Sequence, residues 1–268
     1  LQSEKRRNLM VVIAVALASC LICFSIVMAL STRQIEKNHV EDTYEAVYTK
    51  ITEEDVSSLK GLDDFSRVGE YYMLAVEPAE QGYNASYIYC DEETMYIARD
   101  QMKLLEGRLP QKEDEVVVSR YFLSNYGADA GIGEKVMLSS ESFHGEYTVT
   151  GIMEGYKEKE VNGTSILLSK EALKGWSGYD PADYRAYVHF KNEQQMDETE
   201  LTARSREIAK EYQLEMPVMN LSYMKFYKQP VNVSMLALVA GIAVLVIIGG
   251  YVAVSYTHLR AHETTLHL

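Results

Sequence analysis

The uncharged run Leu9–Leu30 places the strongest limit on what this chain can fold into. A helix over these residues rises about 1.5 Å per residue and extends roughly 33 Å, enough to cross a hydrocarbon core of about 30 Å. Lys5, Arg6 and Arg7 precede the run directly, whereas the residues that follow it carry charges of both signs. Since basic flanks stay on the cytoplasmic side, we predict a membrane helix whose amino end is inside.

A cleaved secretory signal is the alternative interpretation, because it also has a basic start and an apolar middle. Signal cores are about 7–15 residues long and end at a site of small residues. The run Leu9–Leu30 is longer, and no break in its hydrophobicity prepares the candidate cleavage site at Ala29–Ser31. We therefore interpret the run as a retained anchor.

A second uncharged run, Met235–Val254, contains glycines at Gly241, Gly249 and Gly250. Glycine is accepted in membrane helices, where small residues let neighbouring helices approach closely. A buried core helix is the alternative. Two crossings predict a cytoplasmic tail over residues 1–8, a first membrane helix over 9–30, an extracytoplasmic domain over 31–234 and a second membrane helix over 235–256.

The segment between the two runs is strongly acidic. The chain has a formal charge of −13, and because its amino tail is net positive the middle segment carries −15. Such a charge argues against nucleic acid or an anionic membrane surface as the partner of this segment. Cys20 and Cys23 lie in the first run and Cys90 stands alone in the domain, so the domain must be stabilised by its core and not by an internal disulfide.

Short β-type and helical patterns follow one another in the domain without a strict β-α-β order, which predicts an α+β fold. The clearest helix, Asp197–Tyr212, places Leu201, Ser205, Ile208, Ala209 and Tyr212 on one side. Shorter helices are predicted over Thr52–Leu59, Arg120–Tyr126 and Ser169–Leu173. Strands are predicted over Glu45–Ile51, Tyr71–Val76, Ser86–Cys90, Met95–Ala98, Val116–Ser119, Val136–Ser139, Tyr147–Met153, Ser165–Leu168 and Tyr184–Phe190.

The most specific motif is Leu104–Ser119, LLEGRLPQKEDEVVVS. Gly107 permits a turn, Pro110 fixes φ and is expected to end a preceding helix, and Glu115 leads into a valine run suited to full burial. Two further motifs follow, GIGEKVML from Gly131 and YTVTGI from Tyr147.

In this order and spacing the motifs resemble the extracytoplasmic core domain of FtsX-like and MacB-like ABC transporter permeases of bacteria. The resemblance extends from Arg7 to about Tyr256, and Glu134 stands where the family often has Asp. It implies structural roles for eight motif residues: Gly107, Arg108, Pro110, Glu115, Gly131, Gly133, Val149 and Gly151. Helix contacts through small residues are expected at Ser19, Gly241 and Gly249.

The resemblance also implies a function, that of a permease subunit in the cell membrane. A separate cytoplasmic ATPase subunit would bind ATP and drive movement of the extracytoplasmic domain, for export or extraction of a peptide, lipoprotein or antimicrobial. The implied partners are this ATPase, a second permease chain in a homodimer or pair, membrane lipid, and an envelope protein or peptide substrate, with no nucleic acid.

The end of the chain, Thr257–Leu268, departs from the family, whose members continue into further membrane helices. It places His262 and His267 five residues apart, off a common helical face, so it does not match the zinc motif HExxH. We interpret residues 257–268 as a non-native tail and the chain as part of a longer permease.

No pattern in the sequence indicates catalysis. Gly127–Lys135 differs from a phosphate-binding loop, since Glu134 precedes Lys135 and Val136 follows it. We therefore expect no catalytic residue, no cofactor of its own and no metal site, and a subunit that is not an enzyme. The main alternative is the ligand-sensing domain of a two-span membrane receptor, while an anchored envelope hydrolase lacks a recognisable catalytic set.

Overall fold

The computed structural model describes residues 43–228 except 81, 100–101, 127–129, 156–157 and 159–162, together with scattered positions between 12 and 40 and between 238 and 250. The chain divides into two units, one of residues 1–38 with 229–268 and one of residues 39–228. Within the described residues, no helix combines the length and the apolar character that a membrane crossing requires. Residues 1–8, the tail 257–268 and much of Leu9–Leu30 and Met235–Val254 lie outside the described residues, so both crossings stay predictions.

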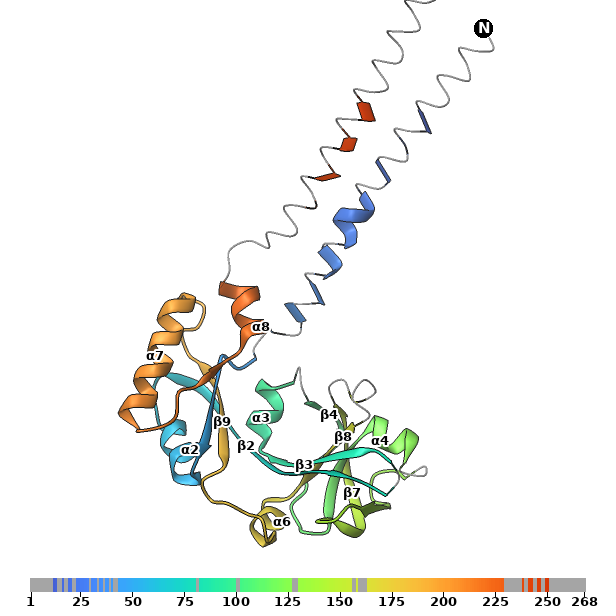
Figure 1. The fold of residues 1–268 in the computed structure, drawn as a ribbon, viewed down its shortest axis with the longest axis vertical. Coiled ribbons are helices and arrows are strands. Elements are labelled where there is room, and N and C mark those ends of the chain that lie inside the picture. Colours follow the sequence, from blue (N-terminus) through green and yellow to red (C-terminus); the bar gives the residue numbers. More distant parts are fainter. Residues whose placement is uncertain are drawn as a thin grey trace, which may run out of the picture. The chain divides into compact units, whose positions relative to one another are not determined.

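The second unit is built on a mixed sheet of ten strands (Figure 1). Along the sheet the order is β10-β1-β9-β2-β3-β8-β5-β7-β4, and β6 pairs with β7 beside this path. The pairs β3–β8 and β5–β7 are parallel, and the other pairs are antiparallel. The strands are β1 (Ala46–Ile51), β2 (Phe65–Pro78), β3 (Asn84–Cys90), β4 (Met102–Gly107), β5 (Glu115–Ser119), β6 (Lys135–Ser139), β7 (His144–Gly155), β8 (Gly163–Leu168), β9 (Tyr184–Phe190) and β10 (Val218–Met219).

Short helices connect the strands, and most begin at a side chain that caps the first turn. They are α2 (Glu53–Lys60), α3 (Glu92–Ile97), α4 (Arg120–Asn125), α6 (Lys170–Gly175), α7 (Glu198–Glu211), α8 (Leu221–Tyr223) and the π-helical turn η1 (Met224–Lys228). Thr52 and Asp197 form capping boxes, in which two backbone donors at the helix start are satisfied reciprocally. The predicted starts of these two helices are therefore confirmed.

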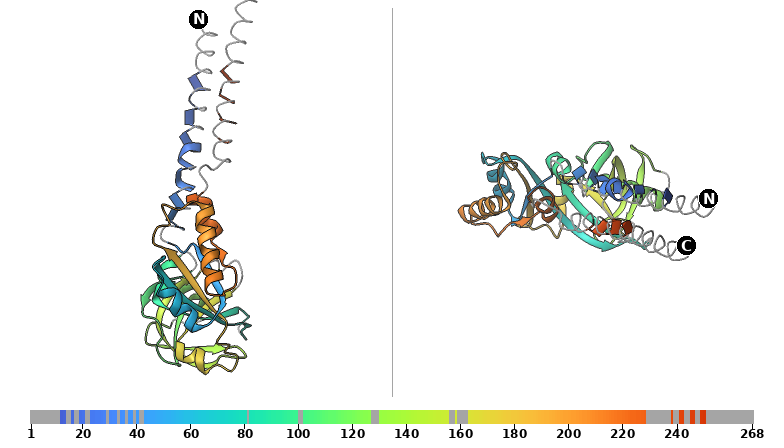
Figure 2. Two further views of the ribbon diagram at one scale, coloured as in Figure 1. Left: turned by 90° about the vertical axis from the view of Figure 1, so that its left-hand side faces the viewer. Right: turned by 90° about the horizontal axis from the view of Figure 1, so that it is seen from above.

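The hydrophobic core lies on both faces of the sheet, and β5 shows this most directly. Val116 and Val118 belong to the larger buried cluster, which includes side chains of α2 and α7, whereas Val117 belongs to a second cluster with α3. Successive strand side chains point to opposite faces, so a continuous valine run is what a strand covered on both faces requires. The views in Figures 1 and 2 show β2, the longest of the described strands, and its neighbour β3 running through the middle of this arrangement.

Two sequence-based expectations are wrong. Met95–Ala98, predicted as a strand, lies in and just after α3, because Asp91 accepts the backbone N–H of Thr94 and starts a helix that buries Thr94, Met95 and Ile97. The segment before Pro110, predicted as a helix, is strand β4, which pairs with β7. In both cases a short apolar run fits helix and strand equally well, and tertiary packing decides.

Candidate functional site

The chain enters and leaves the domain at one place, called here the junction (residues 43–47 and 218–220). Strands β1 and β10 pair there, with Ala46 opposite Met219. The backbone N–H of Asn220 donates to the carbonyl of Glu45 at 2.8 Å, and its side-chain amide donates to the carbonyl of Tyr44 at 2.9 Å. The same side chain accepts from the first amides of α8, so it ties the incoming strand to the outgoing helix.

A buried carboxylate lies at the junction. The side chain of Glu45 has no solvent exposure, accepts from His189 Nδ1 at 2.7 Å and accepts from the backbone N–H of Phe190 at 2.7 Å. Burial opposes the charged form of His189, but the hydrogen bond and the charge of Glu45 outweigh it and raise the pKa of His189. The pair thus fixes β9 against the residues that lead into β1.

A second cluster, called here the motif corner (residues 107–115, 131–134 and 148–151), brings the family-motif residues together around β7. Gly107 lies opposite Gly151 in the β4–β7 pair and has a φ of +82°. A Cβ at Gly107 would lie 2.2 Å from the carbonyl oxygen of Thr150, so only glycine fits. The next residue, Arg108, donates its backbone N–H to the same carbonyl at 3.0 Å.

Arg108 and Glu115 form the charged part of the motif corner. The guanidinium donates to both carboxylate oxygens, at 2.7 and 2.8 Å, in the bidentate geometry that suits this pair. The backbone amides of Gln111 and Lys112, directly after the half-buried Pro110, also donate to Glu115. The hydrogen bonds from Arg108 and these amides outweigh burial and lower the pKa of Glu115 to about 2.

The turn before β6 completes the motif corner. Gly133 has a φ of +88° and donates its N–H to the carbonyl of the buried Val149 at 2.8 Å. The carboxylate of Glu134 accepts the backbone N–H of Gly131 at 2.8 Å, so the glutamate at the position of the family's usual aspartate closes the turn itself. These contacts join backbone groups to one another and to the Arg108–Glu115 pair. The structural role that the resemblance implies for the eight motif residues stays a prediction.

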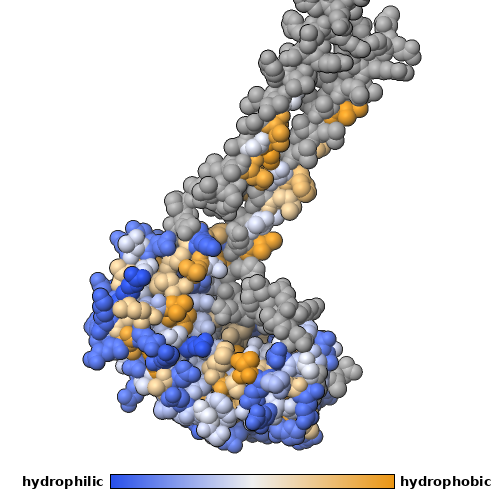
Figure 3. Space-filling model, in the orientation of Figure 1, coloured by the Kyte–Doolittle hydropathy of each residue, from blue (hydrophilic) through white to orange (hydrophobic). Residues whose placement is uncertain are grey.

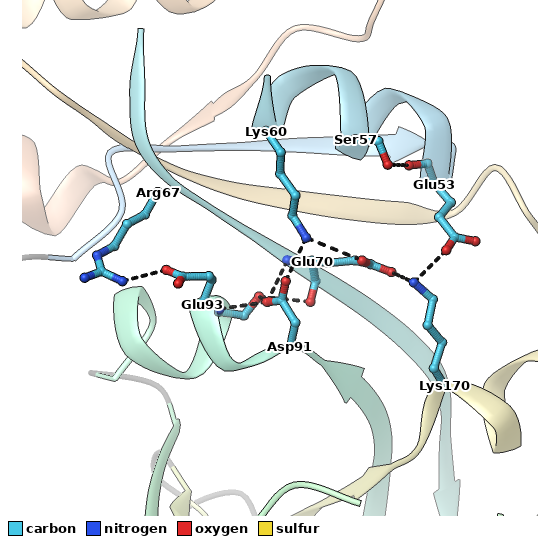
Figure 4. A network of polar contacts seen from close by, with 9 residues as sticks. Glu53, Ser57, Lys60, Arg67, Glu70, Asp91, Glu93 and Lys170 are labelled. Carbon is cyan, nitrogen blue, oxygen red and sulfur yellow. Dashed lines mark hydrogen bonds and ion pairs between the residues drawn. The ribbon is translucent and has the colours of Figure 1, made fainter. Parts of the chain in front are cut away.

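A network of ion pairs joins helices across the middle of the sheet (Figure 4). The side chain of Glu70 on β2 is 8% exposed and lies 2.6 Å from Lys170 Nζ on α6 and 3.7 Å from Lys60 Nζ on α2. Lys170 also contacts Glu53, and Lys60 contacts Asp91, which caps α3. The network connects α2, α3 and α6 to the central strand β2.

The remaining predicted site residues lie outside this domain. Ser19, Gly241 and Gly249 are helical and exposed, and a Cβ at either glycine would meet no atom within 4 Å. Their helix contacts stay a prediction. Within the part of the chain that the structure describes, no three His, Cys, Asp or Glu side chains are placed to hold a metal ion.

The sequence analysis missed Glu45, His189 and Asn220 at the junction. The only signal for Asn220 was its suitability as a helix cap, since an amide oxygen accepts the free amides of a first turn. Nothing in the sequence joins Glu45 to His189.

Fold and junction together define a mixed α and β domain inserted between two flanking segments. A family model described as the MacB-like periplasmic core domain matches residues 9–206. The chain therefore belongs to this family, whose core domain is the extracytoplasmic part of ABC transporter permeases, and the resemblance seen in the motifs is confirmed. Membership implies a membrane protein with an extracytoplasmic segment and a cytoplasmic ATPase partner.

Two transporter domains are among the solved structures that a structural comparison finds similar to this chain. The extracellular domain of the noncanonical ABC-type transporter YknZ from Gram-positive bacteria is 15% identical, with a TM-score of 0.47 over 66% of this chain and 100% of that chain. The periplasmic region of MacB from Actinobacillus actinomycetemcomitans is 11% identical, with a TM-score of 0.46 over 69% of this chain and 92% of that chain. A comparison with curated protein sequences gives no match.

Proposed function

We propose that this chain is part of a permease subunit that converts ATP hydrolysis by a separate cytoplasmic ATPase into movement of its extracytoplasmic domain. The subunit binds no cofactor and has no catalytic activity of its own. The movement serves export or extraction of a peptide, lipoprotein or antimicrobial. The amino terminus lies in the cytoplasm, and residues 31–234 lie outside.

The observation that carries the proposal is the junction. The two flanking segments attach to neighbouring strands, β1 and β10, and Asn220 bonds directly to the backbone of Tyr44 and Glu45. A shift of either predicted membrane helix therefore reaches the same edge of the sheet. Packed and hydrogen-bonded elements are the physical carriers of coupling, and the ion pairs of Glu70 with Lys170 and Lys60 join α6 and α2 to β2.

The other partners follow from the predicted membrane helices. Small residues at Ser19, Gly241 and Gly249 allow close packing with the helices of a second permease chain, in a homodimer or a pair. Membrane lipid surrounds these helices, and the domain meets an envelope protein or the transported peptide.

The test uses the full-length permease with its ATPase in lipid vesicles. Met137, 49% exposed on β6, is replaced by Cys for a spin label after Cys20→Ser and Cys23→Ser, and distances between labels on paired chains are measured with and without ATP. We expect an ATP-dependent shift in the distance distribution. Asn220→Ala should weaken that shift, whereas Asn192→Ala in an exposed turn should leave it intact.

Identical distances in both conditions would contradict the proposal. A membrane-impermeant maleimide added to intact cells checks the topology separately, because Met137→Cys should react from outside. ATP hydrolysis by the chain without its partner would contradict the absence of catalytic activity.

A further inference from the structure

The segment through which the chain leaves the domain exposes more apolar surface than a water-facing segment needs. Met216 is 55% exposed, Val218 61%, Leu221 69% and Tyr227 40%. We call the exposed side chains of residues 216–227 the exit face. Figure 3 shows that the surface of this domain is largely hydrophilic in that view, with hydrophobic side chains in a few places.

The outward direction of these side chains is fixed by what lies beneath them. Tyr223 and Met224 are 3% and 2% exposed and belong to the main core cluster. Leu221 and Lys225, four residues apart, are exposed and so lie on the opposite side of α8 and η1. Among the described strands, β10 pairs with β1 alone, so Val218 lies on the outermost strand of the sheet.

The charge of this segment is opposite to that of the rest of the domain. Glu215 is the last acidic residue before the second apolar run, and the sequence from Met216 to Val254 contains Lys225 and Lys228 with no Asp or Glu. The domain as a whole would be repelled by a negatively charged surface. The exit face lacks that repulsion and carries an exposed cation.

Only a few residues separate the exit face from the second apolar run, which limits the distance between them. Lys228 lies seven residues before Met235, and a fully extended chain spans at most about 3.6 Å per residue, roughly 25 Å in all. If Met235–Val254 crosses the membrane, as the proposed function requires, Lys228, which directly follows the exit face, can lie no farther than that from the start of the second apolar run.

We propose that the exit face rests on the lipid headgroup region of the extracytoplasmic leaflet, an inference that depends on the proposed function. Tyrosine and lysine beside exposed aliphatic side chains are the composition of segments that lie in this interface, with rings at the headgroup level and lysine reaching the polar layer. The bilayer thus holds the junction at a fixed height, so that a shift of the membrane helices is transmitted to β1 and β10.

Fluorescence quenching by lipids with brominated acyl chains tests the proposal. The chain has one tryptophan, Trp176, whose ring packs against Phe143, so Trp176→Phe keeps a ring there and removes the natural signal. Into this background we place Leu221→Trp, with Met137→Trp as a matched control at an exposed position of β6. A third variant, Leu245→Trp, reports on the second apolar run. Each full chain is reconstituted into phosphatidylcholine vesicles with and without brominated lipid.

We expect Leu221→Trp to lose roughly half of its emission in brominated vesicles, Leu245→Trp to lose more, and Met137→Trp to keep its emission. Quenching of Leu245→Trp without quenching of Leu221→Trp would overturn the exit-face proposal and leave the proposed function intact. An unquenched Leu245→Trp would overturn the proposed function itself. A blue shift of Leu221→Trp without quenching would indicate a protein partner, such as a second copy of the chain, and would also overturn the lipid contact.

Discussion

The junction and the motif corner each bury a carboxylate, but they satisfy it in different ways. Glu45 is fully buried and pairs with His189, a residue 144 positions away in the sequence. Glu115 is 7% exposed and pairs with Arg108, only seven positions away. Arginine remains charged at every pH of interest, whereas histidine loses its charge near neutrality.

This difference separates two kinds of structural role. The motif corner is a local device, in which one short segment supplies the glycine, the cation, the carboxylate and the amides that bind it. The junction is assembled from distant segments, because β1, β9 and β10 meet only in the folded sheet. A cluster built from one short segment can be recognised in the sequence as a motif. A cluster built from distant segments consists of single residues that no sequence pattern marks.

The largest expected effect on stability comes from the motif corner, where Gly107 lies close to the carbonyl of Thr150. Gly107→Ala should lower the free energy of unfolding by about 3 kcal/mol or more, because the new Cβ meets the Thr150 carbonyl at a positive φ. Gly133→Ala is the matched control, since its φ is equally positive but a Cβ there meets nothing within 4 Å, and about 1 kcal/mol is expected. Urea unfolding of the purified chain in detergent measures both, and equal losses would show that backbone strain alone matters.

The next effect tests the junction. Glu45→Ala should lower the free energy of unfolding by about 3 kcal/mol, because it leaves the buried amide of Phe190 without its acceptor and leaves His189 Nδ1 with the carbonyl of Thr43 alone. The exposed Glu211→Ala should change it by less than about 0.5 kcal/mol. Similar values for the two variants would mean that the carboxylate does not hold the junction together.

Arg108→Ala should lower the free energy of unfolding by less than Glu45→Ala does, because the guanidinium is half-exposed and Glu115 keeps its backbone donors when it is lost. Arg108→Lys keeps the charge but not the bidentate geometry and should recover only part of the loss. Thermal unfolding followed by circular dichroism ranks the three proteins, and a lysine variant as stable as the natural chain would argue against the bidentate pair.

The smallest effect is a pH dependence with opposite signs in the two regions. Because the pKa of Glu115 is lowered to about 2, its stabilisation is complete above the ordinary carboxyl range and is lost as the pH falls towards 2. Because the pKa of His189 is raised above 6.5, its stabilisation is complete below 6.5 and is lost as the pH rises through the raised value.

Two variants separate these contributions. The difference in unfolding free energy between the natural chain and Arg108→Ala should shrink on acidification, and the difference for His189→Gln should shrink on alkalinisation. Parallel pH profiles for the two variants would contradict the opposite signs.

Strong local signals predicted much of the fold. Tyr184–Phe190 matches β9 in its bounds, because Ala186, Val188 and Phe190 recur at every second position, the period of a strand. The helix after Asp197 was equally visible from its cap and its apolar side, and Leu201, Ser205, Ile208 and Ala209 are buried as predicted. Met95–Ala98 failed because four apolar and small residues carry no period, and the aspartate that starts α3 lies outside that window.

The sequence did not predict which strands pair with each other in the sheet. The motif corner could be located from its residues, although not the contact of Gly107 with the Thr150 carbonyl, since that depends on the register of β4 against β7. The junction depends on which strand becomes the neighbour of β1. Neither Asn220 nor His189 carries a mark of that topology in the sequence.

The pairing of the first and last strands, β1 and β10, has a consequence for the evolution of such proteins. Neighbouring strands are about 4.8 Å apart, so everything between Ala46 and Met219 is a closed insert whose two ends nearly meet. A different folded module whose ends lie equally close together meets the same requirement on the chain. The membrane part and the outer part of such a protein can therefore diversify separately, each keeping its half of a shared attachment.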